Sequence, residues 1–115
     1  MAIDVFKTVE IIEVMENFLY NKRPDEAIRH QVDLIYKIEN QSVIISELRP
    51  SWSKPGEVIE RGIAKATYFK NKNNWKVFWS RADGQWHGYT PKLIVEDLKE
   101  FVALVEEDKH YCFWG

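Results

Sequence analysis

The sequence predicts an α+β fold with an N-terminal helix, a five-stranded antiparallel meander sheet and a C-terminal helix. We expect both helices to cover one face of the sheet. Three observations lead to this prediction. Apolar residues recur at steps of three and four near both ends of the chain, apolar and polar residues alternate between the ends, and turn sequences separate the alternating segments. Short connections favour an antiparallel meander, which can leave one face open to solvent.

The first predicted element is a helix over residues 4–20. Its expected apolar face contains residues at helical spacing, namely Val5, Val9, Ile12, Met15 and Leu19. Glu10, Glu13 and Asn17 lie on the opposite side of this helix. The helix should end before Pro24, because the residue that precedes a proline is driven out of the helical conformation.

Alternation of apolar and polar residues predicts a strand over residues 32–39, and a β-rich run predicts a second strand over residues 42–49. We expect a third strand over residues 62–70, a fourth over residues 75–81 and a short fifth over residues 86–89. A long loop over residues 50–60 separates the second strand from the third. Asp83-Gly84 predicts a type I′ hairpin turn, since both central residues of that turn need positive φ. On the fourth strand, Trp75 and Trp79 share one face while Lys76 and Phe78 share the other.

The last predicted element is a helix over residues 97–108. Asp97 followed by Glu100 has the form of a capping box. The apolar stripe of this helix consists of Leu98, Phe101, Val102 and Val105.

The composition restricts which classes of protein the chain can belong to. The chain has 115 residues, of which 45% are hydrophobic and 30% charged, so it forms a folded protein and we expect one domain over residues 1–115. The longest apolar run, Phe101–Val105, is far too short to span a membrane. The single cysteine, Cys112, excludes a disulfide within the chain and predicts a reducing, cytoplasmic location.

We expect neither a metal nor a cofactor. Asp108, His110 and Cys112 alternate near the C-terminus, but a structural zinc site needs a second pair of Cys or His ligands. A cysteine between aromatic residues is more often a small buried side chain. Phe113-Trp114-Gly115 is expected to pack against the sheet or against a partner subunit.

Charge is distributed unevenly along the chain. Residues 42–90 carry a net charge of +4, whereas residues 1–21 and 91–115 each carry −3. This division can steer an anion to one surface. Alternatively, the acidic helices simply solvate one side while lysines protect strand edges from pairing.

Charged residues at strand ends mark a candidate site. Glu47 and Arg49 end the second strand, Arg81 ends the fourth, and Asp83 and His87 belong to the hairpin that follows. We expect them to form a polar cluster at one end of the sheet, near Trp52 and Trp86. The cluster would bind an anion or perform acid–base chemistry. A structural network of ion pairs is the alternative.

Several motifs together resemble one protein family. They are Glu47-Leu48-Arg49-Pro50-Ser51-Trp52, Ala64-Lys65-Ala66-Thr67-Tyr68, Trp79-Ser80-Arg81-Ala82-Asp83-Gly84-Gln85-Trp86-His87-Gly88-Tyr89 and the ending Cys112-Phe113-Trp114-Gly115. From about Arg23 onwards the chain resembles an uncharacterised bacterial family, domain of unknown function 3024. The resemblance implies a small stand-alone bacterial protein, and it implies no activity or catalytic residue.

Two functional hypotheses follow. The first is a non-enzymatic binding or adaptor domain for an anionic partner, namely nucleic acid, a phosphorylated ligand or an acidic protein surface. Its expected contacts are Arg49, Trp52, Arg81, Trp86 and His87. Aromatic and basic residues interleave over residues 68–81, as in sheets that bind single strands, although the sequence pI is only about 5.9.

The second hypothesis is a small hydrolase or transferase. Glu47, Asp83 and His87 would act as acid–base groups, and Arg49 and Arg81 would bind substrate charge. A homodimer is compatible with either hypothesis.

Overall fold

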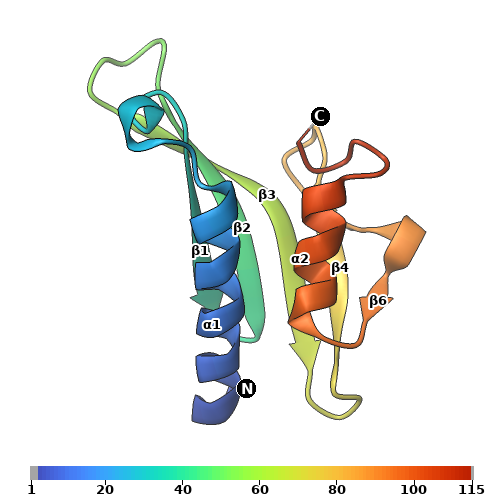
Figure 1. The fold of residues 1–115 in the computed structure, drawn as a ribbon. Coiled ribbons are helices and arrows are strands. Elements are labelled where there is room, and N and C mark those ends of the chain that lie inside the picture. Colours follow the sequence, from blue (N-terminus) through green and yellow to red (C-terminus); the bar gives the residue numbers. More distant parts are fainter. Residues whose placement is uncertain (1–2, 115) are drawn as a thin grey trace.

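The computed structural model describes residues 3–114, which form two helices and an antiparallel sheet (Figure 1). The helices are α1 (Val5–Lys22) and α2 (Leu98–Glu107). The strands are β1 (Asp33–Glu39), β2 (Ser42–Pro50), β3 (Val58–Phe69), β4 (Asn74–Ser80), β5 (Trp86–Gly88) and β6 (Ile94–Val95). Two short 3₁₀ helices, η1 (Glu26–Ile28) and η2 (Thr90–Lys92), lie in the connections.

The first five strands form the predicted meander in the order β1-β2-β3-β4-β5, and all pairs are antiparallel. The sixth strand was not predicted. It pairs with Trp75 and Lys76 of β4, while β5 pairs with Phe78–Ser80 on the same side of that strand. A strand of two residues is too short to show alternation, which is why the sequence pattern missed it.

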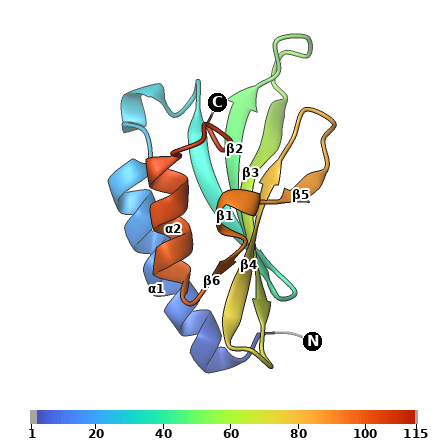
Figure 2. The same ribbon diagram turned by 90° about the vertical axis from the view of Figure 1, so that its right-hand side faces the viewer.

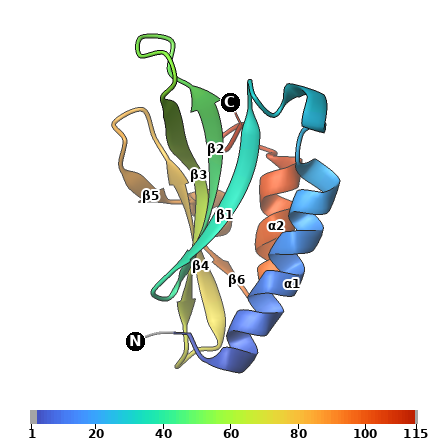
Figure 3. The same ribbon diagram turned by 90° about the vertical axis from the view of Figure 1, so that its left-hand side faces the viewer.

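Both helices cover one face of the sheet, as predicted (Figures 2 and 3). The core between these layers combines apolar side chains from both helices with alternate residues of the central strands. The sheet contributes Val43, Ile45, Ala64, Ala66, Trp75 and Val77, and α2 contributes the predicted stripe of Leu98, Phe101, Val102 and Val105. The alternate positions of β2, β3 and β4 face away from the helices.

The predicted buried face of α1 was wrong over its first half. Met15 of the predicted stripe is buried and Leu19 packs partly buried against the core, but Val5, Val9 and Ile12 are exposed. The helix buries Ile11 and Phe18 instead. Both sides of α1 carry apolar residues at helical spacing, so periodicity could not identify the side that meets the sheet.

The strand β3 begins at Val58, four residues before the predicted start, so the loop spans residues 51–57 rather than 50–60. A bulge explains the longer strand. Ile45 pairs with Ala64 and Ser46 pairs with Gly62, which leaves Ile63 as an extra residue. Beyond the bulge, β2 and β3 form a hairpin whose tip extends past the C-terminal end of α1 (Figure 1).

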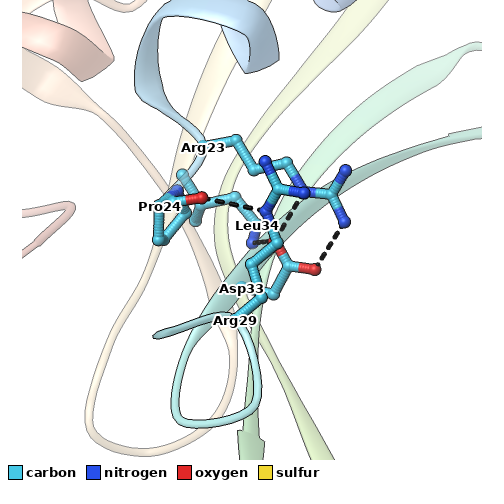
Figure 4. Close-up of polar contacts among 5 residues, drawn as sticks. All are labelled: Arg23, Pro24, Arg29, Asp33 and Leu34. Carbon is cyan, nitrogen blue, oxygen red and sulfur yellow. Dashed lines mark hydrogen bonds and ion pairs between the residues drawn. The ribbon is translucent and has the colours of Figure 1, made fainter. Parts of the chain in front are cut away.

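A bidentate ion pair fastens the end of α1 to the start of β1 (Figure 4). Arg23 donates from Nε and Nη2 to the two carboxylate oxygens of Asp33, each at 2.8 Å. The Arg23 hydrogen bond is the main cause that lowers the pKa of Asp33, and the Leu34 amide adds to it. Within the segment that connects α1 to β1, Arg29 Nε donates to the Pro24 carbonyl at 2.9 Å. The helix ends at Lys22, near the predicted position.

The N-terminus of α2 is capped by the predicted residue. Asp97 Oδ1 accepts from the Glu100 amide at 2.9 Å. In a capping box the Glu100 carboxylate would accept from the backbone amide of Asp97. It accepts instead from the amide of Glu96, one residue earlier.

The tail after α2 packs back on the protein. Phe113 is buried against Tyr89, with ring centroids 4.9 Å apart, and Trp114 Nε1 donates to the Val105 carbonyl at 2.7 Å. The Asp108 carboxylate accepts hydrogen bonds from the backbone amides of both residues, from Phe113 N at 3.1 Å and from Trp114 N at 2.9 Å. Gly115, the last residue of the predicted tail motif, lies outside the described residues.

Candidate functional site

The predicted site residues of β2 form an ion pair with each other. Arg49 Nε donates to Glu47 Oε1 at 2.8 Å, and this hydrogen bond raises the pKa of Arg49. The two side chains lie two positions apart on one strand and therefore share a face. The Glu47 side chain is 13% exposed and that of Arg49 is 58% exposed. Trp52, in the following loop, is 94% exposed.

The hairpin between β4 and β5 holds a second pair. His87 Nε2 lies 2.9 Å from Asp83 Oδ2, and Asp83 Oδ1 accepts from the Gln85 amide at 2.9 Å. The hydrogen bond from Gln85, followed by that from His87, lowers the pKa of Asp83. An exposed carboxylate that binds an imidazole in this way can fix its tautomer and support proton transfer.

The hairpin turn differs from the predicted type I′ turn. Gly84 has a φ of 77°, but Asp83 does not have positive φ. Gly84 N donates to Arg81 O at 2.9 Å and Arg81 N donates to Gln85 O at 3.2 Å. These bonds define a three-residue loop with a glycine bulge, in which only one residue needs positive φ.

The structure thus brings the predicted residues together as separate pairs. Within residues 3–114, no hydrogen bond or ion pair joins Glu47–Arg49 to Asp83–His87. Arg81 lies over the ring of Trp79, at 5.5 Å from its centroid. Glu47 and Arg49 pair within β2, and Asp83 and His87 pair within the β4–β5 hairpin.

A second set of residues gathers on the face that the helices leave uncovered. We call Lys65, Lys76, Phe78 and Trp86 the open-face set. Lys65 is paired with Phe78 across β3 and β4, and Trp86 belongs to β5 beside them. Since Ala64, Ala66, Trp75 and Val77 point into the core, the intervening side chains project from the opposite face. In Figure 3 this face lies on the side of the sheet away from α1 and α2.

The open-face set is held together by contacts between ammonium groups and rings. Lys65 Nζ lies 4.7 Å from the Phe78 ring centroid and 5.3 Å from that of Trp86. Lys76 Nζ lies 5.2 Å from the Phe78 centroid. Such cation–π contacts contribute about 0.5–1 kcal/mol at exposed sites. They hold both amines above the aromatic surface.

A glycine allows the Trp86 ring to lie against the sheet. A Cβ atom added at Gly62 would be 2.8 Å from Cζ2 of Trp86, so no larger residue fits without movement. Glycine within a strand often marks such a close approach. The ring position is therefore set jointly by the β3 backbone and by Lys65.

Electrostatics distinguishes the lysines of this face. Lys37 forms an ion pair with Glu60 at 2.7 Å. By contrast, neither Lys65 nor Lys76 has a carboxylate within ion-pair distance among the described residues. Burial lowers the pKa of Lys65, while the charge of Glu39 raises it to a smaller extent. An anion placed over the rings would offset this loss of hydration.

Sequence reasoning found part of this set. Alternation correctly placed Lys76 and Phe78 opposite Trp75 and Trp79, and Trp86 was among the candidate contacts. Lys65 was missed because its position beside Phe78 depends on the pairing of β3 with β4, and alternation within one strand carries no information about register.

The fold is an α+β sandwich of two helices on one face of an antiparallel sheet, and the exposed groups form a surface rather than an enclosed centre. The family model described as Domain of unknown function (DUF3024) matches residues 3–115, and the chain belongs to this family. No curated protein and no solved structure matches the chain. The match includes α1, which the sequence resemblance did not cover.

Two further findings describe residues 3–114. None of their helices combines the length and apolar content needed to cross a bilayer. No three His, Cys, Asp or Glu side chains in this part of the chain gather closely enough to hold a metal ion. Asp108 instead binds two backbone amides, and Cys112 contacts the His110 carbonyl at 3.7 Å.

Proposed function

We propose that the protein is a non-enzymatic binding domain that holds a single-stranded nucleic acid on the open face of its sheet. The observation that carries this proposal is the pair of lysines, Lys65 and Lys76, which contact aromatic rings and have no carboxylate partner within residues 3–114. Domains that bind single strands stack bases on aromatic rings and hold phosphates with neighbouring lysines. Phe78 and Trp86 would supply the rings.

Local charge supports an anionic partner. The ammonium group of Lys65 is partly desolvated between two rings, so binding a phosphate would restore favourable interactions that burial removed. Residues 42–90, which include β2 to β5, also carry a net charge of +4. The overall net charge of −2 predicts modest affinity that depends steeply on salt.

Binding can be measured by fluorescence anisotropy with a labelled oligothymidine over a range of salt concentrations. We expect Lys65→Gln/Lys76→Gln to weaken binding at least 10-fold. Its salt slope should fall by about 1.4, since each phosphate contact on a single strand contributes about 0.7. Trp86→Leu should weaken binding by about 1–3 kcal/mol through lost stacking.

A matched control has the same change in charge at a distant site. Lys99→Gln/Lys109→Gln removes two exposed lysines from α2 and the segment that follows it. Binding that is unchanged in this control, but lost in Lys65→Gln/Lys76→Gln, supports the open face. Equal loss in both variants, or no binding by the wild type at low salt, refutes the proposal. Equal competition by polyglutamate would indicate an acidic protein surface instead.

A second candidate function is a small hydrolase or transferase, and the hydrogen bond between His87 and Asp83 favours it. In this alternative Asp83 orients His87 as an acid–base group, Glu47 is a further acid–base group, and Arg49 and Arg81 bind substrate charge. Hydrolysis of p-nitrophenyl phosphate that disappears in both His87→Ala and Asp83→Asn would support it. Hydrolysis unaffected by His87→Ala would exclude it.

We also propose a location in the bacterial cytoplasm. Cys112 is the single cysteine, and burial raises the pKa of its thiol. Such a thiol reacts slowly and suits a reducing compartment. Fractionation of the cells that produce the protein, with detection by antibody, tests this assignment.

A further inference from the structure

A pocket lies where the turn between β3 and β4 meets the start of α1. Its volume is about 320 Å³, and three separate segments line it. They are the segment that leads into α1, the turn between β1 and β2, and the end of β3 with the turn that follows. We call it the end pocket, and its wall consists of Ile3, Asp4, Gln41 and residues 68–72. In Figures 2 and 3 the β3–β4 turn lies beside the start of α1 at one end of the molecule.

The end pocket continues the open face of the sheet. Lys65, Thr67 and Phe69 occupy alternate positions of β3, and the register of β3 with β4 is unbroken from Ala64 to Phe69. Since side chains alternate along a strand, Phe69 lies on the same face as Lys65. Four residues of a strand span about 13 Å. A nucleic acid strand that lies along β3 from the open-face set would therefore reach this pocket within a short distance.

The charge of the end pocket favours an anion. Lys70 and Lys72 are exposed, and neither forms an ion pair within residues 3–114. Among the lining residues that the structure describes, Asp4 has the one carboxylate, and its Oδ1 accepts from the Lys7 amide at 2.8 Å. Two lysines against one carboxylate give the wall a net charge of +1. Both ammonium groups are thus available to a ligand.

The size and the aromatic content of the end pocket suit one nucleotide. Pockets for small ligands usually measure about 300–1,000 Å³, and this pocket is at the lower end of that range. Phe69 is 41% exposed on its wall, and stacking on an aromatic ring tolerates any base. The segment before α1 and the β1–β2 turn form walls where β3 ends. A strand that follows β3 would therefore place its last nucleotide here.

On the basis of the proposed binding of a single strand, on which this inference rests, we propose that the end pocket binds the terminal phosphate monoester of that strand. Lys70 and Lys72 hold the phosphate, and the terminal base stacks on Phe69. A phosphate monoester carries about −1.5 to −2 charges at pH 7 and three strong acceptor oxygens, whereas a phosphodiester within the strand carries one charge. Two ammonium groups with three donors each therefore favour the monoester. The end pocket selects strands with a phosphorylated end.

Competition between oligothymidines tests this selection. Unlabelled competitors with a 5′-phosphate, a 3′-phosphate or no terminal phosphate displace the labelled oligothymidine in the anisotropy assay. We expect one phosphorylated competitor to bind about 10-fold more tightly than the unphosphorylated one, since a hydrogen bond to a charged group contributes on this scale. Lys70→Gln/Lys72→Gln should remove the difference. The control Lys99→Gln/Lys109→Gln, with the same change in charge, should keep it. Equal binding of all three competitors by the wild type overturns the proposal, as does a preference that survives Lys70→Gln/Lys72→Gln.

Variants of the open face separate this inference from the proposed function. Lys65→Gln/Lys76→Gln should weaken the binding of all three competitors, while the preference for a phosphorylated end remains. If the wild type binds no oligothymidine, the proposed function fails, and thymidine monophosphate then tests the end pocket alone through the NMR shifts of the amides of residues 69–72. Shifts with the monophosphate but not with thymidine, lost in Lys70→Gln/Lys72→Gln, would support a pocket for a free nucleotide. Absence of both sets of shifts would overturn the site. Thermal unfolding of each variant confirms that the fold is retained, because Lys70 and Lys72 are exposed.

Discussion

Asp108 anchors the C-terminal tail, and replacing it tests how the tail contributes to stability. Its side chain accepts hydrogen bonds from the amides of Phe113 and Trp114. The residue is 8% exposed and has a φ of 43°, which is the left-handed region. Asp108→Ala therefore removes two hydrogen bonds. It also places alanine, which rarely adopts positive φ, at this position.

The expected cost follows from these contacts. A hydrogen bond to a charged group contributes about 1.5–3 kcal/mol, and the buried Phe113 amide loses its partner entirely. Backbone strain at positive φ adds about 1 kcal/mol for alanine. We expect Asp108→Ala to lower the free energy of unfolding by about 4–5 kcal/mol. The melting temperature should fall by about 15 °C for a chain of this size.

Two further variants separate the causes. Asp108→Gly removes the hydrogen bonds but tolerates positive φ, so it should be about 1 kcal/mol more stable than Asp108→Ala. Asp108→Asn keeps one acceptor oxygen and should be the most stable of the three. Urea unfolding followed by circular dichroism measures these differences. A free energy of unfolding for Asp108→Ala within about 1 kcal/mol of the wild type would refute the reasoning.

Three other perturbations have defined outcomes. Gly62→Ala should cost about 1–3 kcal/mol through overlap with the Trp86 ring, and a double-mutant cycle with Trp86→Ala should show strong non-additivity. Burial, followed by the hydrogen bond that the Tyr36 hydroxyl donates to Glu16, raises the pKa of Tyr36 to about 12, so stability should fall as pH rises from about 10 towards that value. Glu16→Gln should lower the pKa of Tyr36 in an ultraviolet titration, and an unchanged value would exclude the hydrogen bond. Trp52→Ala should change the free energy of unfolding by less than about 0.5 kcal/mol, because the side chain is exposed, and a larger loss in urea would show a packing role.

Much of the fold could be predicted because the signals are local. Alternation indicated β1, a β-rich run indicated β2, and the Asp97 cap and apolar stripe indicated α2. The early part of β3 was missed because Trp52, Pro55 and Gly56 indicate a loop, and the strand resumes directly after them. Whether a strand continues through such a segment depends on its pairing with β2, and a bulge at Ile63 accommodates it.

The candidate site was predictable only where partners are near in sequence. Glu47 and Arg49 lie two residues apart, and Asp83 and His87 lie four apart, so each pair could be expected from its own segment. A contact such as that of Lys65 with Phe78 and Trp86 depends on the register of three strands. Register is fixed by packing of the whole sheet, and a single sequence does not display it.

The sharing of β4 between β5 and β6 has a consequence for assembly in concentrated solution. The side of β4 that faces away from β3 bonds to β5 at one end and to β6 at the other, and Val77 bonds to Leu93 and Tyr89 between them. Its backbone amides and carbonyls are therefore not available as a template for a foreign strand. Such protection keeps this side of β4 out of the edge-to-edge pairing that leads to fibres.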